Sequence, residues 1–206
     1  MAKAGIVYVG TTDGLATYSD PGGTGRWRRV GHSLEGRAVR ALLAADALTL
    51  LAAVNGAALR TADGGQSWAA APEGEAAGLL DLAAAGEPVL ATAHGPARWR
   101  GEHAPAPGAA ALALLAGKQE TLIAAIAGGT SLVRSEDGGA SWAPVTVEGG
   151  LLGGIAVIAP SSYHMDIAWA GTDQGQLLRS DDRGRTWREV GRERAGVLSL
   201  AVVRLA

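Results

Sequence analysis

Three copies of one eight-residue motif constrain the fold of this chain more than any other feature of its sequence. The copies begin at Thr61, Ser135 and Ser180, and each ends in a tryptophan. They share the pattern [ST]-x-D-x-G-x-[ST]-W, and each follows a Leu-Arg or Val-Arg pair. A motif that recurs within 206 residues indicates repeated copies of one supersecondary unit.

The chemistry of the motif is that of a hairpin corner. The aspartate can accept hydrogen bonds from backbone N–H groups just after it, and the following glycine can take a positive φ. The two hydroxyls can tie the strand ends together, while the tryptophan supplies a large apolar ring with one N–H donor. We therefore assign structural corners to Thr61, Asp63, Gly65, Ser67 and Trp68, to Ser135, Asp137, Gly139, Ser141 and Trp142, and to Ser180, Asp182, Gly184, Thr186 and Trp187.

The motif resembles the Asp-box of the BNR repeat family, which occurs in sialidases, xyloglucanases, sortilin-type receptors and photosystem assembly factors. The resemblance implies a β-propeller. It also implies that the motif is a structural turn on the face opposite the usual active site. A catalytic or metal-binding role for the motif carboxylates is the less favoured alternative.

The sequence around the motifs predicts blades of four strands. The clearest unit comprises residues 155–159, 166–171, 175–180 and 186–190, and two others align to it. One unit departs from the pattern. Leu79–Ala83 and Val89–Ala93 are predicted as its first two strands, but Gly101–Pro105 replaces its motif.

The N-terminal unit lacks an inner strand and has a degenerate corner between Ser19 and Trp27. Residues 197–202 have nothing after them to form a further blade, so we expect them to pair beside residues 5–10 and close the ring. An open solenoid is the competing fold, but solenoids cap their ends instead of exchanging strands. The prediction is an all-β, single-domain (1–206), five-bladed propeller, with blades at about 1–31 plus 195–206, 36–72, 77–107, 109–147 and 153–191.

Composition limits the partners and the compartment. Hydrophobic residues make up 48% of the chain, yet Phe is absent, and the net charge of −2 gives no reason to expect nucleic acid or an anionic membrane as a partner. Without Cys there is no disulfide framework, and no apolar stretch is long enough to span a bilayer. We expect a soluble, cytoplasmic monomer, although a secreted protein whose leader had been removed would look the same.

Ligands of propellers usually bind at the axis, on the face opposite the motif turns. The predicted loops on that face are short, and Arg40 and Asp81 interrupt otherwise apolar inner strands on adjacent blades. These two residues are interpreted either as an inter-blade ion pair or water-lined channel, or as a polar anchor for a small ligand. Arg37 and Arg194 could bind an anion or a sugar carboxylate. The candidate ligand rim comprises Asp13, Glu35, Arg37, Arg40, Asp81, Asp173 and Arg194.

No catalytic residue, metal ligand or cofactor is assigned. Sialidase chemistry needs an arginine cluster, a Tyr–Glu nucleophile and an acid/base aspartate, and Tyr8, Tyr18 and Tyr163 are all predicted away from the rim. The four histidines show no ligand spacing. A glycosidase using two rim carboxylates is harder to exclude; its candidates are Asp13, Glu35, Glu73, Glu75, Glu148 and Asp173.

These features favour a non-catalytic binding or scaffold module that holds a protein or a saccharide. The alternative is a glycoside hydrolase that uses rim carboxylates, which rests on analogy of fold. A third candidate is an assembly factor like the photosystem proteins, which the missing export signal and the low blade count disfavour.

Overall fold

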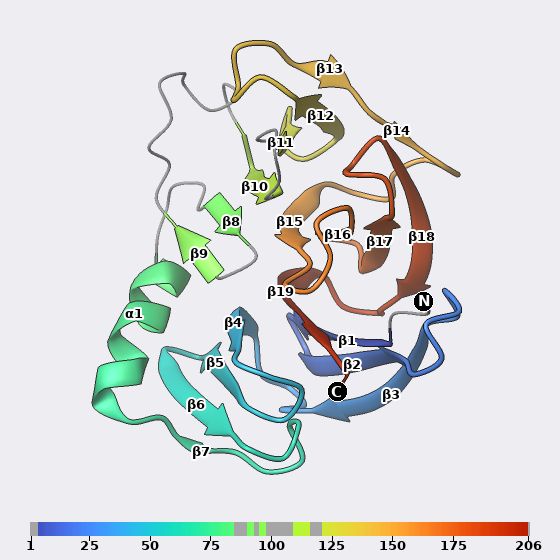
Figure 1. Cartoon of the computed structure of the whole chain (residues 1–206). Helices are drawn as coiled ribbons and strands as arrows, with labels where there is room; N and C mark the ends of the chain where they lie inside the picture. The colour runs from blue at the N-terminus through green and yellow to red at the C-terminus, as the bar shows by residue number, and fades with distance from the viewer. Residues whose placement is uncertain (1–3, 85–89, 93–94, 98–108, 116–120, 206) are drawn as a thin grey trace.

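The structure is a computed structural model that describes residues 4–84, 90–92, 95–97, 109–115 and 121–205. These residues are nearly all β, with one helix and four sheets. Figure 1 shows the sheets arranged around a common centre, with the strands β4, β19, β15 and β10 innermost. Among these inner strands, β19 contacts both β4 and β15, and β15 also contacts β10.

The first sheet contains both ends of the described chain. Its order is β19-β1-β2-β3, and β19 pairs antiparallel with β1 from Gly5↔Arg204 to Thr11↔Val197. The predicted pairing of residues 197–202 with residues 5–10 is therefore observed. The strand bounds are β1 Gly5–Thr11, β2 Gly14–Asp20, β3 Arg28–Ser33 and β19 Val197–Arg204.

The second sheet has the order β4-β5-β6-β7 and is built from one continuous stretch of chain. Each strand pairs antiparallel with its neighbour. The motif that begins at Thr61 connects β6 to β7. The bounds are β4 Val39–Ala44, β5 Leu50–Val54, β6 Ala57–Thr61 and β7 Ala69–Ala70.

The third sheet has six strands in the order β13-β12-β11-β10-β8-β9. Its strands β8 and β9 form a hairpin that joins β10 in parallel, through the pairs Leu112↔Leu90 and Ala113↔Ala91. The bounds are β8 Leu90–Thr92, β9 Gly95–Ala97, β10 Ala111–Leu115, β11 Thr121–Ile126, β12 Ser131–Ser135 and β13 Ala143–Pro144.

The fourth sheet has five strands in the order β14-β18-β17-β16-β15. Strand β14, which follows the third sheet in the chain, lies parallel to β18 and so links the two sheets. The bounds are β14 Thr146–Val147, β15 Ile155–Pro160, β16 Ala168–Thr172, β17 Gln176–Ser180 and β18 Thr186–Arg192.

The prediction of an inner strand at Leu79–Ala83 is wrong, because these residues lie in helix α1 (Glu73–Ala84). Pro72 precedes the helix, and its carbonyl accepts from the backbone of Glu75 and Ala76. The acidic Glu73 and Glu75 lie at the positive end of the helix dipole. The segment is rich in Ala and Leu and has no β-branched residue, a composition that favours helix over strand.

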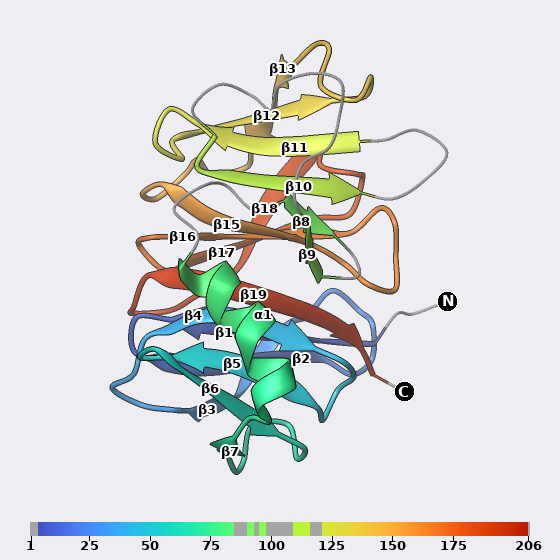
Figure 2. The same cartoon turned by 90° about the vertical axis from the view of Figure 1, so that its left-hand side faces the viewer.

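The segment between the second and third sheets therefore does not form a separate sheet in the described residues. Helix α1 contacts β4, β5 and β6 of the second sheet, while β8 contacts β10 and β15. Figure 2 shows α1 in front of the second sheet, with β8 and β9 to the right of its upper end. The rest of the predicted blade, including the Gly101–Pro105 corner, lies outside the described residues. Four sheets are described, so the predicted count of five blades is not confirmed.

The hydrophobic core lies mostly between sheets. One cluster joins the first and fourth sheets through Val7, Trp27 and Trp169. Another joins the third and fourth through Ile123 and Trp187. A third joins the first and second through residues that include Leu15 and Leu50. Apolar surface is therefore buried mainly by contacts between neighbouring sheets, and less by contacts within one sheet.

Candidate functional site

The aspartate organises the hydrogen bonds in all three motif turns, which comprise residues 61–68, 135–142 and 180–187. Asp182 Oδ1 accepts from the backbone N–H groups of Arg185 and Thr186, both at 2.9 Å, and its Oδ2 accepts from Thr186 Oγ1 at 2.7 Å. Asp63 and Asp137 accept in the same way from Ser67 N and Ser141 N, both at 2.9 Å. Each aspartate thus fixes its own turn.

The other motif residues also have defined partners. The hydroxyl of Ser180 accepts from Gly184 N at 2.8 Å, and the equivalent bonds occur in the other two turns. Gly184 has a φ of 80°, a conformation that glycine adopts without a Cβ clash. The indole N–H of each motif tryptophan donates to the carbonyl of the motif glycine at 3.1 Å. Trp187 is buried, whereas Trp68 and Trp142 are half-buried.

Hydrogen bonding keeps the motif carboxylates ionised. The bonds from the Ser67 hydroxyl and backbone hold the pKa of Asp63 well below its usual range, and those from Ser141 do the same for the pKa of Asp137. Burial raises the pKa of Asp182, but bonds from Thr186 and Ser180 outweigh it and the net shift is downward. A carboxylate with a lowered pKa is a permanent acceptor and a poor general acid.

Two of the motif turns pack against the sheet that precedes theirs in the chain. A Cβ on Gly184, in the fourth sheet, would clash with Cδ1 of Ile123 in the third. A Cβ on Gly65, in the second sheet, would lie 3.5 Å from Leu15 and Ser33 in the first. The degenerate turn of the first sheet packs against the fourth, where the Trp27 and Trp169 rings lie 4.6 Å apart. We call these three contacts the seams between sheets.

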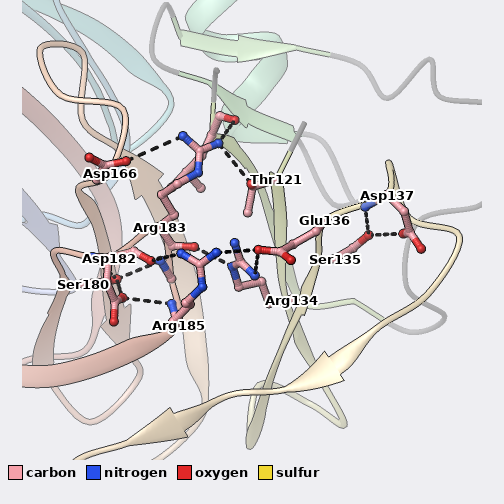
Figure 3. A network of polar contacts seen from close by, with 12 residues as sticks. Thr121, Arg134, Ser135, Glu136, Asp137, Asp166, Ser180, Asp182, Arg183 and Arg185 are labelled. Carbon is pink, nitrogen blue, oxygen red and sulfur yellow. Dashed lines mark hydrogen bonds and ion pairs between the residues drawn. The ribbon is translucent and has the colours of Figure 1, made fainter. Parts of the chain in front are cut away.

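Figure 3 shows the polar network at the seam between the third and fourth sheets. The Arg183 guanidinium donates to Thr121 Oγ1 at 3.0 Å, while the Arg183 carbonyl accepts from Arg134 Nε at 2.7 Å. Glu136 binds both Arg134, at 2.6 Å, and Arg185, at 2.7 Å. The variable positions of two motif turns therefore carry one ion pair, Glu136–Arg185, and the hydrogen bonds of Arg183 that join the two sheets.

The opposite ends of the inner strands form a rim that is connected by backbone hydrogen bonds. Gly14 N donates to the Arg37 carbonyl at 2.8 Å, and Thr12 N donates to the Gly196 carbonyl at 2.9 Å. One turn, between β1 and β2, therefore holds both the loop that carries Arg37 and the loop that carries Arg194. Arg37 and Arg194 are far apart in the sequence, so the sequence does not show that their loops lie close together.

A β-bulge marks the second residue of three adjacent inner strands. The bulged residues are Arg40 in β4, Leu198 in β19 and Ala156 in β15. Arg40 and Ala156 are exposed, and Leu198 is half-buried. A bulge redirects the side chain that it carries. Arg40 is therefore exposed at a bulge, and in the described residues no ion pair is found for Arg37, Arg40 or Arg194.

The rim acids Asp13, Asp173 and Glu35 contact nearby residues. Asp13 Oδ1 accepts from Gly36 N, and Asp173 Oδ1 accepts from Gly154 N, both at 2.9 Å. Glu35 lies 3.3 Å from His32 Nδ1. Asp81 is predicted on the inner strand of the blade next to that of Arg40, and that prediction is wrong because Asp81 lies in α1. The predicted choice between an Arg40–Asp81 ion pair and a shared polar anchor therefore loses its basis.

A Tyr–Glu pair that the sequence does not predict joins β2 to the residue after β18. Tyr18 OH donates to Glu193 Oε1 at 2.7 Å, and Arg29 Nε lies 3.1 Å from the same oxygen. Burial, followed by the Glu193 hydrogen bond, raises the pKa of Tyr18. This arrangement stabilises the neutral phenol, whereas a nucleophilic tyrosine needs the phenolate to be accessible. The residues are 175 positions apart, and no local pattern signals the contact.

Within the described ranges, no group of three or more His, Asp or Glu side chains could hold a metal ion. No helix of the described residues is long and apolar enough to cross a membrane.

No family model and no curated protein matches this chain. Among solved structures, it is similar to a GH74 enzyme from Niastella koreensis (14% identity, 93% of this chain and 25% of that chain, TM-score 0.33). It is also similar to YCF48 bound to D1 peptide (17%, 92% and 79%, 0.29) and to the GH74 xyloglucanase from Xanthomonas campestris (16%, 91% and 37%, 0.33). The chain spans only a quarter of the Niastella enzyme. At these TM-scores the likenesses carry no argument about activity or partners.

The seam contact of Gly184 can be tested against a matched glycine. Gly184 and Gly150 both have a positive φ, but nothing lies within 4 Å of a Cβ built on Gly150. Gly150→Ala should cost only the backbone strain, about 1–2 kcal/mol. Gly184→Ala should cost a further 1–3 kcal/mol or so, because Ile123 must move. Urea unfolding of both variants measures the difference, and equal losses would show that the turn does not pack on the third sheet.

The ionised state of the motif aspartates predicts an acid dependence of stability. The folded pKa of Asp137 lies below its unfolded value of about 3.9. Its stabilising effect is therefore complete above that value and is lost as the pH falls toward the folded pKa. Asp137→Asn removes the titration, so the free energy of unfolding should fall less steeply below about pH 4 than in the wild type. Denaturant midpoints at neutral and acid pH give the comparison, and parallel pH dependences would contradict the assignment.

Proposed function

We propose that this protein is a non-catalytic binding module built as an Asp-box β-propeller, and that its rim binds an anionic group of a partner protein or saccharide. The proposal that the motif turns are Asp-boxes is supported by their shared hydrogen-bond pattern. The proposal of a propeller is supported by four sheets around one centre and by seams between neighbouring sheets.

The same proposal includes closure of the ring. A shared apolar cluster joins each of three pairs of sheets. These pairs are the second and first, the first and fourth, and the fourth and third. Helix α1 contacts the second sheet, and the β8–β9 hairpin extends the third. We take α1 and the β8–β9 hairpin to occupy the place of the fifth blade. In this arrangement the rim lies at the mouth of the ring.

The observation that carries the binding proposal is the bulge at Arg40. The bulge redirects the exposed Arg40 side chain, and bulges recur at the same position of the inner strands β19 and β15. The rim turn between β1 and β2 brings the loops of Arg37 and Arg194 to the same end of these strands. Arginine donates through a planar fork that matches carboxylate geometry. Three exposed arginines at one mouth therefore favour a ligand with carboxylate or similar groups.

The test compares two triple variants of equal charge. The rim variant is Arg37→Ala, Arg40→Ala and Arg194→Ala. The control is Arg26→Ala, Arg28→Ala and Arg204→Ala, three exposed arginines that also lack ion pairs within the described residues and lie toward the opposite ends of the strands. Both proteins and the wild type are screened on arrays of acidic peptides and of uronate-containing glycans.

The rim variant should lose at least about tenfold in affinity for any captured probe, since charge-assisted hydrogen bonds contribute roughly 1.5–3 kcal/mol each. The control should stay close to the wild type. Equal losses in both variants would mean non-specific attraction and would reject the rim as the site. A separate assay with aryl glycosides tests the hydrolase alternative. Turnover that disappears in Asp13→Asn or Asp173→Asn would overturn the non-catalytic part of the proposal.

A further inference from the structure

The seam between the first and fourth sheets differs from the other two in its polar chemistry. Trp27 and Trp169 meet edge to face, at an interplanar angle of 82°, and both rings are buried. The Arg179 guanidinium lies 5.4 Å and 5.6 Å from the two ring centroids and is also buried. Tyr163 packs against the same cluster. These four residues are called the seam cluster.

Each member of the seam cluster has a buried polar atom without a hydrogen-bond partner among the described residues. The atoms are Nε1 of Trp27, Nε1 of Trp169, Nε of Arg179 and the hydroxyl of Tyr163. The only other such atom in the described chain, Arg134 Nη2, lies at a different seam. Four of the five unpartnered atoms thus belong to one cluster, whereas buried polar groups in folded proteins nearly always have a partner.

The motif tryptophans show why this seam is unusual. In the motif turns, five positions separate the aspartate from the tryptophan, and the indole N–H reaches the carbonyl of the intervening glycine. In the degenerate turn, Asp20 and Trp27 are seven positions apart, and Asp20 accepts instead from Thr24 and Gly25. The Trp27 indole is therefore left without the carbonyl that the other turns supply.

Nearby acceptors are already engaged. Asp181 pairs with Nη2 of Arg179 through one oxygen and with Arg188 through the other, at 3.3 Å. Both oxygens of Asp20 accept within its own turn. The aromatic faces can stabilise the guanidinium, but an indole N–H is a donor only and needs an acceptor.

We propose that the seam cluster binds buried water between the first and fourth sheets. Water is the smallest molecule that can accept from the indole and guanidinium N–H groups and also donate to the Tyr163 oxygen. Buried waters characteristically satisfy groups of this kind. One water accepts two hydrogen bonds, so complete satisfaction of the three N–H donors requires more than one molecule.

The test uses the tryptophan indole protons, which NMR resolves individually. Bound water that stays for longer than a few nanoseconds gives cross-relaxation with a nearby proton that differs in sign between the laboratory and rotating frames. We expect such water cross-peaks at the indole Hε1 of Trp27 and Trp169. The internal control is Trp187, which is equally buried but donates to the Gly184 carbonyl at 3.1 Å and should show none.

Assignment of the indole signals by triple-resonance spectroscopy needs no variant, so a substitution that fails to fold cannot block the test. A crystal structure at high resolution provides the second measurement, with ordered density expected within about 3.2 Å of at least two of the four atoms. Indole signals of Trp27 and Trp169 that match Trp187, together with a dry seam in the crystal, would overturn the proposal. A rearranged seam in which protein groups bond these four atoms would overturn it equally.

Discussion

The pairing of β19 with β1 is the contact on which the rest of the architecture depends. It holds the two ends of the described chain in one sheet, and at Gly10 the packing leaves no space for a larger side chain. A Cβ on Gly10 would clash with Ser199 Oγ and would lie 2.6 Å from the Val39 carbonyl. The Ser199 hydroxyl donates to the same carbonyl at 2.8 Å, so β19 is tied to the second sheet as well as to the first. One strand from the end of the chain therefore connects two sheets and contributes apolar residues to the seam with the fourth.

The seams between sheets are built from a repeated set of contacts. An ionised aspartate fixes each motif turn, and in two of the turns the glycine lies close to the preceding sheet. The tryptophan adds apolar area. The side chains at the variable positions of the motif then determine the polar contacts of a seam. At the seam between the third and fourth sheets Glu136 and Arg185 form an ion pair, and Arg183 donates a hydrogen bond to Thr121. At the seam between the first and fourth sheets the motif is degenerate, and aromatic and cationic groups replace its regular bonds.

Local chemistry explains which parts of the structure could be predicted from the sequence. The motif turns were predictable because every partner of Asp63 or Asp182 lies within a few residues. The pairing of the two chain ends followed from counting strands. Helix α1 was missed because Leu79–Ala83 carries apolar residues that suit either a strand or a helix, and the deciding features, Pro72 and the two glutamates, lie outside that window.

The candidate site was less predictable because it depends on long-range geometry. The sequence predicts the rim residues only as loop or inner-strand positions, and no local pattern shows that Arg40 occupies a bulge. These residues are Asp13, Glu35, Arg37, Arg40, Asp173 and Arg194. The same limit applies to Tyr18 and Glu193, which form a hydrogen bond although 175 positions separate them in the sequence. Residues brought together by long-range contacts carry no signal in a local window.

Amide hydrogen exchange along β1 tests the central claim most directly. Strand β1 lies between β19 and β2, so all of its amides from Ile6 to Gly10 should be strongly protected. Strand β3 provides the control, because it pairs only with β2 in the described residues and should show protection at alternate amides. Continuous protection in β1 with alternate protection in β3 is the result that the structure predicts. Alternate protection in β1 would show that its edge is open, and it would contradict the pairing on which this account depends.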